Sequence, residues 1–112
     1  MWAQPHNVKG LRNVTASLAQ LQTATRAAVI DGPGSTETAL RQQVASGQPL
    51  PELVALVDKI RSRAYAITDA DVDALRARYN DDQLFELIVA AAVGAAEERL
   101  RAALDAVEAA CG

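Results

Sequence analysis

The sequence predicts an all-α protein. Apolar residues recur at spacings of three and four along the chain, and no stretch shows the alternation of period two that marks a strand. Alanine is abundant, while aromatic residues make up only 4% of the 112 residues. This composition favours close packing between helices, and the pattern predicts about five helices with short connections in a single domain.

The longest apolar stretch runs from Leu84 to Ala96 and is interrupted only by Glu86 and Gly94. A helix that is apolar on every side must be surrounded by protein, and this one is shorter than the roughly 20 residues that cross a bilayer. The helical pattern continues beyond the stretch and predicts one long C-terminal helix over 81–110, roughly 45 Å in length. Either this helix breaks near Gly94, or part of it packs against a second copy of the chain.

The first ten residues show no apolar period, so we expect an N-terminal arm over 1–10 before a helical domain over 11–112. Trp2 in the arm is expected to pack onto a neighbouring surface. Residues 11–30 have the apolar spacing of an amphipathic helix. The Gly-Pro-Gly sequence at 32–34 ends this helix, because glycine accepts left-handed conformations and proline cannot continue the hydrogen-bond ladder.

A second, short helix is expected after this turn, capped by Ser35 or Thr36 and stopped at Gly47. Pro51 suits the first position of a third helix. The apolar stripe of that third helix consists of Leu53, Leu56, Val57, Ile60 and Ala64.

Two further helix starts carry the spacing of a capping box, in which a polar side chain caps the helix and a residue three positions later returns the contact. Thr68 and Asp71 form the first pair, before a short helix. Asn80 and Gln83 form the second pair and begin the long C-terminal helix.

Charge and cysteine content exclude several classes of function. Eleven basic and fourteen acidic residues are interleaved and give a net charge of -3, so electrostatic capture of nucleic acid or of an anionic membrane is not expected. Cys111 is the single cysteine and His6 the single histidine, which excludes an internal disulfide and argues against a metal site or cofactor. No secretion signal is recognised, so a cytoplasmic protein is expected.

Five segments follow one another in the second half of the chain: LVDKI at 56–60, AY at 64–65, ITDADVDAL at 67–75, DQLFEL at 82–87 and AAAVGA at 90–95. This succession resembles the carboxymuconolactone decarboxylase and alkylhydroperoxidase D-like superfamily, over roughly residues 50–104. The resemblance implies an all-helical, alkylhydroperoxidase D-like fold that assembles through its helices into dimers, trimers or hexamers.

The redox branch of that superfamily carries a Cys-X-X-Cys-X-X-X-His motif before the Thr-Asp-Ala-Asp turn. The corresponding positions fall near Pro51, Val54 and Asp58. A thiolate must attack the peroxide and a second thiol must resolve the product, so these residues remove that chemistry. Cys111 is alone at the far end, and peroxidase activity is therefore not expected.

Glu86 is the first candidate catalytic residue, because it is the one ionisable side chain in the apolar run. Burial of a carboxylate raises its pKa and makes it a candidate general acid or base. The alternative is structural: a carboxylate near the positive end of the helix, bonded to an arginine or to a loop.

A group of cationic and aromatic side chains precedes the Thr-Asp-Ala-Asp turn and is able to bind a small carboxylic acid. Lys59 and Arg63 lie four residues apart on one helix face as candidate substrate-binding residues, and Tyr65 is the second candidate for proton transfer. The alternative is a solvated face with weak surface ion pairs.

Two functional hypotheses follow from the sequence. The first is a self-associating helical protein without redox activity, a homo-oligomer that binds a small organic acid or a partner protein. The second is a lyase or isomerase of a small carboxylic acid, with Lys59 or Arg63 holding the carboxylate and Glu86 or Tyr65 moving the proton. A third hypothesis is that the chain is a subunit that functions only together with a second, different chain. Only the apolar stripes of the predicted helices support it.

Overall fold

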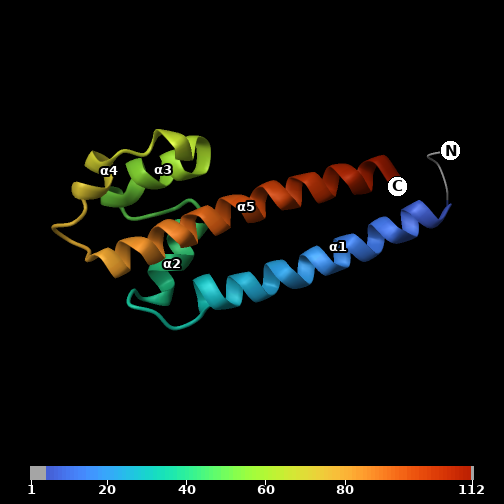
Figure 1. Cartoon of the computed structure of the whole chain (residues 1–112), viewed down its shortest axis with the longest axis horizontal. Helices are drawn as coiled ribbons and strands as arrows, with labels where there is room; N and C mark the ends of the chain where they lie inside the picture. The colour runs from blue at the N-terminus through green and yellow to red at the C-terminus, as the bar shows by residue number, and fades with distance from the viewer. Residues whose placement is uncertain (1–4, 112) are drawn as a thin grey trace.

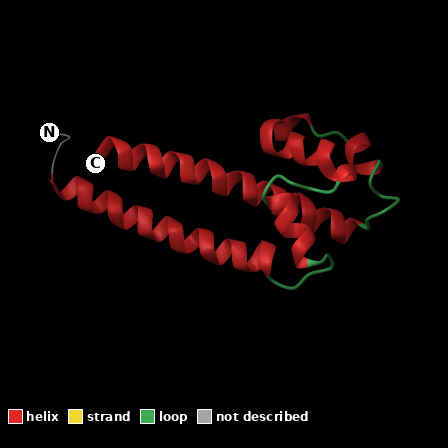
Figure 2. Ribbon diagram, turned by 180° about the vertical axis from the view of Figure 1, so that it is seen from behind, coloured by secondary structure: helices red, strands yellow, loops and turns green. Residues whose placement is uncertain are grey.

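The computed structural model describes the backbone of residues 5–111 and the side chains of residues 16–110, and over that range it contains helices and no strand (Figures 1 and 2). The α-helices are α1 (Pro5–Arg26), α2 (Thr38–Ala45), α3 (Val54–Arg63), α4 (Asp69–Asp73) and α5 (Asp81–Cys111). A π-helical turn, η1 (Ala27–Asp31), continues α1, and the 3-10 turns η2 (Pro51–Leu53) and η3 (Ala64–Ala66) flank α3. The predicted all-α class is confirmed.

The molecule divides into a head, residues 27–95, and a stalk, formed by α1 and residues 96–111 of α5. Figure 1 shows α1 and α5 running side by side away from the head, where α2, α3 and α4 gather around the first half of α5. The molecule measures 58 × 29 × 19 Å, with a radius of gyration of 17.2 Å. A compact domain of this length has a radius of gyration of about 13 Å, so the stalk gives the chain an unusually extended shape.

The start of α1 corrects the expected N-terminal arm, because residues 5–10 belong to the helix. Pro5 is well suited to a helix start, since the N–H that proline lacks has no partner in the first turn. Trp2 and its expected packing lie outside the described residues.

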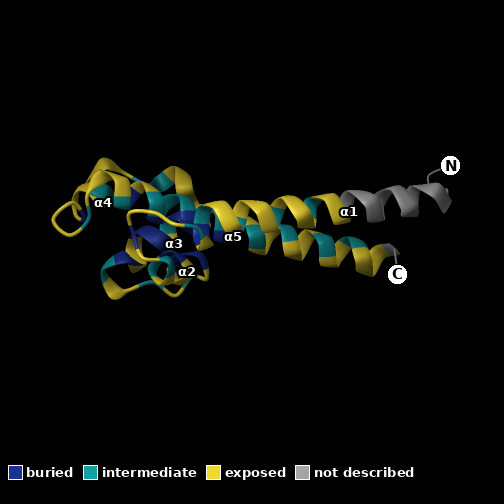
Figure 3. Ribbon diagram, turned by 90° about the horizontal axis from the view of Figure 1, so that it is seen from below, coloured by how far each residue is buried: buried dark blue, intermediate teal, exposed yellow. Residues whose placement is uncertain are grey.

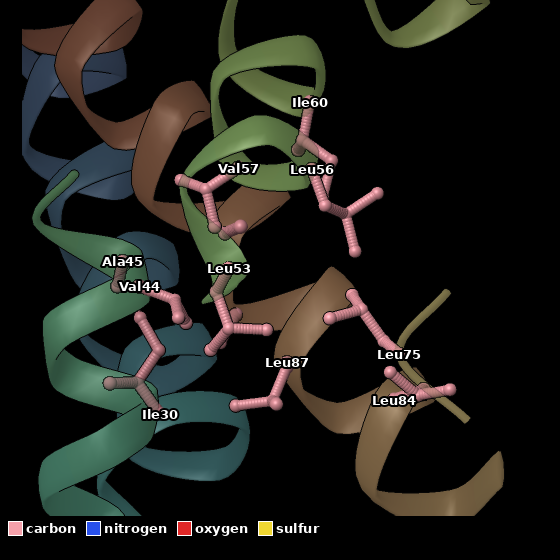
Figure 4. Packing of buried hydrophobic residues seen from close by; sticks show 12 residues of the cluster. Ile30, Val44, Ala45, Leu53, Leu56, Val57, Ile60, Leu75, Leu84 and Leu87 are labelled. Atoms are coloured by element: carbon pink, nitrogen blue, oxygen red, sulfur yellow. The ribbon is translucent and has the colours of Figure 1, made fainter. Parts of the chain in front are cut away.

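The core of the head joins α2, α3 and the first half of α5 (Figure 4). Its buried members are Ile30, Val44, Ala45, Leu53, Leu56, Val57, Ile60, Leu75, Leu84, Leu87, Ala90 and Ala91. The stripe predicted for the third helix is confirmed from Leu53 to Ile60. Ala64 is exposed, because α3 ends one residue before it.

The apolar run at the start of α5 is only partly enclosed within one chain. Leu84 and Leu87 are buried by the head, whereas Phe85 on the opposite face is 68% exposed. The helix also passes through Gly94 without a break. The long helix predicted from Asp81 is therefore present, but one side of its apolar run remains open to solvent.

Gly94 allows α2 and α5 to approach each other closely. A Cβ placed on Gly94 would lie 2.0 Å from the carbonyl oxygen of Ala45, the last residue of α2. Arg61 Nη1 donates to the same carbonyl at 3.1 Å. The glycine that the sequence suggested as a break point is thus a contact point, where only a hydrogen atom fits between two backbones.

The turn after α2 brings that carbonyl into position. Gly47 has a φ of 79°, as predicted for a stop signal, and its N–H donates to Val44 O at 3.3 Å. Gln48 N donates to Gln43 O at 3.0 Å, which completes a Schellman turn. The chain therefore reverses immediately after the contact with α5.

Both predicted capping boxes are confirmed. Thr68 Oγ1 accepts from Asp71 N at 3.3 Å, and Asp71 Oδ2 accepts from Thr68 N at 2.9 Å. Asn80 Oδ1 accepts from Gln83 N at 2.8 Å, and Asn80 N donates to Gln83 Oε1 at 2.9 Å. Both boxes are built from residues three positions apart, which is why the sequence alone predicts them.

The predicted cap of α2 by Ser35 or Thr36 is wrong. Glu37 occupies the N-cap position, without a side-chain hydrogen bond to the helix. Ser35 and Thr36 instead donate to a side chain of α5.

The stalk has no fully buried side chain within 16–26 and 96–110, the part of it whose side chains are described (Figure 3). Its half-buried positions on α5 recur at spacings of three and four, at Glu97, Leu100, Leu104 and Val107. Arg26 Nη1 of α1 lies 2.8 Å from Glu97 Oε1. The two helices thus face each other through one seam that still exposes apolar surface.

Replacing Gly94 with alanine is expected to lower the free energy of unfolding by about 3 kcal/mol, because the new methyl group must displace the α2 backbone. Urea denaturation monitored by circular dichroism measures this change. The matched control is Ala92→Gly, at an exposed position of the same helix, which should cost only about 1 kcal/mol of helix propensity. A stability gain in Gly94→Ala, as an unobstructed helix position would give, contradicts the close contact.

Candidate functional site

Glu86 lies in the second turn of α5 and binds the loop between η1 and α2, 50 residues earlier in the chain. Its Oε2 accepts from the backbone N–H of Ser35 at 2.6 Å. Its Oε1 accepts from the N–H and the hydroxyl of Thr36 at 3.0 and 2.8 Å. A Cβ on Gly34 would lie 2.5 Å from Oε1, so glycine at this position leaves room for the carboxylate.

These donors lower the pKa of Glu86 from 4.5 to about 2, with the Ser35 amide the largest cause and the Thr36 amide the next. The catalytic interpretation of Glu86 expected the opposite shift, a raised pKa, and that expectation is wrong because hydrogen bonds to the charged form outweigh desolvation. A carboxylate with this pKa is a weak base at neutral pH. Proton transfer by Glu86 stays a prediction, and the geometry favours the structural alternative.

Arg41 lies behind the same loop and is 2% exposed. Its Nη1 donates to Val29 O at 3.3 Å, and its Nη2 donates to the carbonyl oxygens of Gly32 and Thr36 and to the hydroxyl of Thr38. The guanidinium therefore replaces water as the partner of three backbone carbonyl groups. Such multiple donation is what makes a buried arginine tolerable.

Together, Arg41 and Glu86 fix the loop by complementary charges. The Arg41 guanidinium donates to the carbonyl oxygen of Gly32, whereas the Glu86 carboxylate accepts from the amide groups of Ser35 and Thr36. Arg41 Nε and Glu86 Oε1 are 4.0 Å apart, so the two charges also attract each other. This cluster, Ser35, Thr36, Arg41 and Glu86, holds η1, α2 and α5 together at one side of the head.

A pocket of about 230 Å³ opens beside this cluster. It is lined by Ala28 and Val29 of η1, Pro33 of the loop, Arg41 of α2, and Phe85, Glu86 and Val89 of α5. The walls are mainly apolar, with the two charged residues at one side. π-helical turns such as η1 are frequent at functional sites, and we therefore take this pocket as the candidate site.

The other predicted site residues lie elsewhere. Lys59 Nζ is bound to Asp71, at 3.0 Å from Oδ1 and 2.8 Å from Oδ2, and this contact, with the Thr68 amide, lowers the pKa of Asp71 from 3.8 to about 2. Arg63 and Tyr65 are exposed, and their side chains make no hydrogen bond or ion pair with the described residues. None of Lys59, Arg63 and Tyr65 lines the pocket beside Glu86.

Sequence reasoning missed Arg41, although the pattern around it contained a signal. Arg41 stands three and four residues before Val44 and Ala45, both buried, and so occupies the apolar stripe of α2. Arg41 is a single cation in the apolar stripe of α2, and Glu86 is a single anion in the apolar run of α5. Such isolated opposite charges are typical of a buried ion pair. The sequence shows both residues but not that they meet.

Two charged residues of the second half of α5 form ion pairs with other helices. Glu97 pairs with Arg26 of α1, and Glu98 pairs with Arg61 of α3. Both pairs join α5 to another element of the fold.

The side chains of residues 16–110 contain no cluster of three or more histidine, cysteine, aspartate or glutamate residues able to hold a metal ion. Within the described residues, no helix has the length and apolar character needed to cross a membrane.

Comparison with known proteins gives no match for this chain among family models, curated proteins or solved structures. The resemblance to the carboxymuconolactone decarboxylase and alkylhydroperoxidase D-like superfamily therefore stays a prediction. The positions of its redox motif, Pro51, Val54 and Asp58, fall along η2 and α3.

The low pKa of Glu86 predicts a specific dependence of stability on pH. Its folded-state pKa of about 2 lies below the ordinary value of 4.5, so the carboxylate stabilises the fold above pH 4.5 and loses this effect as the pH falls toward 2. Glu86→Gln should therefore be less stable at neutral pH and should show a shallower loss of stability over this range. The remaining slope contains the contribution of Asp71, whose pKa is lowered to about 2.

Urea denaturation at intervals from pH 6 to pH 2 measures this slope. Asp58→Asn, which removes an exposed carboxylate of α3, is the matched control and should keep the slope of the parent protein. An unchanged slope in Glu86→Gln would show that the loop amides do not stabilise the charged carboxylate.

Proposed function

We propose that this protein is a self-assembling helical module whose stalk pairs with the stalk of a second copy to form a four-helix bundle. The single observation that carries the proposal is that two long helices leave the head with an apolar seam but no fully buried side chain among the described stalk residues. Two helices alone bury little surface, and most helical stability comes from packing against further elements. A second pair of helices supplies that packing.

The apolar surface of the stalk is concentrated between the two helices. Leu18 and Leu21 of α1 and Val93 and Leu100 of α5 line a groove of about 200 Å³. Leu21 is 63% exposed. A leucine placed over such a groove is a typical anchor for a helix of a neighbouring molecule.

The size of the stalk matches what a stable dimer needs. Helix α1 has 22 residues and is therefore about 33 Å long, and a pair of helices is roughly 20 Å wide. A face of these dimensions contributes roughly 650 Å² from each copy, or about 1,300 Å² in total, which lies within the range of specific interfaces.

The charges of the stalk favour a second copy as the partner. Helix α1 carries Lys9, Arg12 and Arg26 and no acidic residue. The second half of α5 has the opposite balance, with Glu97, Glu98, Asp105 and Glu108 against Arg99 and Arg101. Glu97 and Glu98 already pair within the chain, with Arg26 and Arg61, which leaves Asp105 and Glu108 for a partner. Two copies related by a two-fold axis can place each α1 against these residues of the partner's α5.

The part of α5 that the sequence suggested as an interface has a different role in this proposal. Leu84 and Leu87 are buried within one chain, so aspartate at these positions would unfold the head and would not report on assembly. Substitutions in the stalk separate loss of assembly from unfolding of the head, because the stalk residues are not part of the core of the head.

Leu21→Asp is the test of this proposal. We expect the parent protein to have twice the monomer mass of 11.8 kDa by light scattering, and the variant to dissociate with a dissociation constant about 100-fold higher, because a charge replaces a central apolar anchor. Circular dichroism should show that the variant remains helical. Tyr65→Asp is the matched control, since it places the same charge on a residue of the head that is 89% exposed, and it should remain a dimer.

A parent protein that is monomeric at about 100 μM contradicts the proposal. An assembly that survives Leu21→Asp also contradicts it, because the copies would then meet through another surface.

A further inference from the structure

Two of the three guanidinium nitrogens of Arg41 donate hydrogen bonds. Nη1 donates to η1, and Nη2 donates to the loop and to α2. Nε is buried and has no hydrogen-bond partner. Buried polar groups are nearly always paired, so an unpaired donor on a side chain that is 2% exposed needs an explanation.

The unpaired donor belongs to a side chain that lines the pocket described above. Nε is 4.0 Å from Glu86 Oε1, beyond hydrogen-bond distance, and both residues line the pocket. The other lining residues are apolar and include Phe85, which is 68% exposed. The pocket therefore combines an apolar enclosure, an aromatic ring at its edge and one donor without a partner.

We propose that this pocket binds a small uncharged molecule with a cyclic hydrocarbon body and one carbonyl or hydroxyl oxygen, which accepts a hydrogen bond from Arg41 Nε. The proposal is independent of the assembly through the stalk, because the pocket belongs to one chain.

The charges beside the pocket select a neutral ligand. Glu86 already accepts three hydrogen bonds from Ser35 and Thr36 and keeps its negative charge, so an anion bound at Nε would lie close to a carboxylate. A cation would lie close to Arg41. A neutral oxygen avoids both repulsions and satisfies the unpaired donor.

The volume of the pocket limits the size of the ligand. At about 230 Å³, it is smaller than the roughly 300–1,000 Å³ of drug-sized sites and larger than the roughly 150 Å³ cavity that encloses benzene. One ring with a short substituent fits this volume, and the exposed ring of Phe85 offers a surface on which an aromatic ligand stacks.

Three probes of similar size test the proposal: acetophenone, which is neutral and has an acceptor oxygen; benzoate, which is anionic; and ethylbenzene, which lacks the oxygen. The measurement is the ¹H–¹⁵N NMR signal of Arg41 Nε, followed during titration of the full chain. Acetophenone should shift this signal saturably, and benzoate and ethylbenzene should bind at least about 10-fold more weakly.

Val89→Phe supplies the variant, because the larger side chain fills the pocket from α5 and Val89 is not a member of the cluster around Arg41. It should lose acetophenone binding while the pH dependence of stability that depends on Glu86 is kept, which shows that the cluster around Arg41 is intact. Val54→Phe, the same substitution at a 42% exposed residue of α3, is the matched control and should keep it. Repeating the titration on Leu21→Asp separates this pocket from the stalk, and binding should be unchanged.

Several outcomes overturn the proposal. Without a saturable shift for acetophenone, the pocket holds water only. Equal or tighter binding of benzoate shows that the charges do not select a neutral ligand, and equal binding of ethylbenzene shows that Nε is not used. Binding that survives Val89→Phe takes place at another site.

Discussion

The buried charge of Arg41 is the constraint on which the arrangement of the head depends. A guanidinium removed from water must find acceptors and a counter-charge, and here the acceptors are the carbonyl oxygens of the loop before α2, while the counter-charge is Glu86 of α5. The loop follows a path that presents its carbonyl groups to Arg41 and its amide groups to Glu86. Because of this requirement, the end of α1, the start of α2 and the first turns of α5 occupy fixed relative positions.

Helix α5 belongs to two environments along its length. Its first half is packed by α2 and α3, and Gly94 marks the closest approach of α2. Beyond Ala95 the helix leaves the head and contacts α1 through a half-buried seam. The long helix is therefore divided between the core of the head and a half-buried seam, and this division gives the proposed self-assembly a physical basis separate from the stability of the head.

Features determined by neighbouring residues were predictable from the sequence, whereas features that join distant segments were not. The capping boxes at Thr68 and Asn80 and the turn at Gly47 depend on residues within a few positions of each other. The pairing of Arg41 with Glu86 spans 45 positions of the sequence, and the pattern shows two isolated charges without showing that they meet. The same limitation applies to Glu86. The sequence allowed either a buried carboxylate with a raised pKa or one bonded to an arginine or a loop, but it did not identify the amide groups of Ser35 and Thr36 that decide between them.

The π-helical turn η1 joins the stalk to the head and determines the direction in which the stalk seam points. A π-turn holds one more residue than an α-helical turn, and one residue corresponds to a rotation of about 100° around the helix axis. Loss of one residue between Ala27 and Asp31 would return the turn to ordinary helix and rotate all of α1 by that angle relative to the head. The seam of α1 would then no longer face α5. Because the same turn contains the buried Ile30, such a deletion would also disturb the core, and the length of this joint therefore couples the orientation of the stalk to the packing of the head.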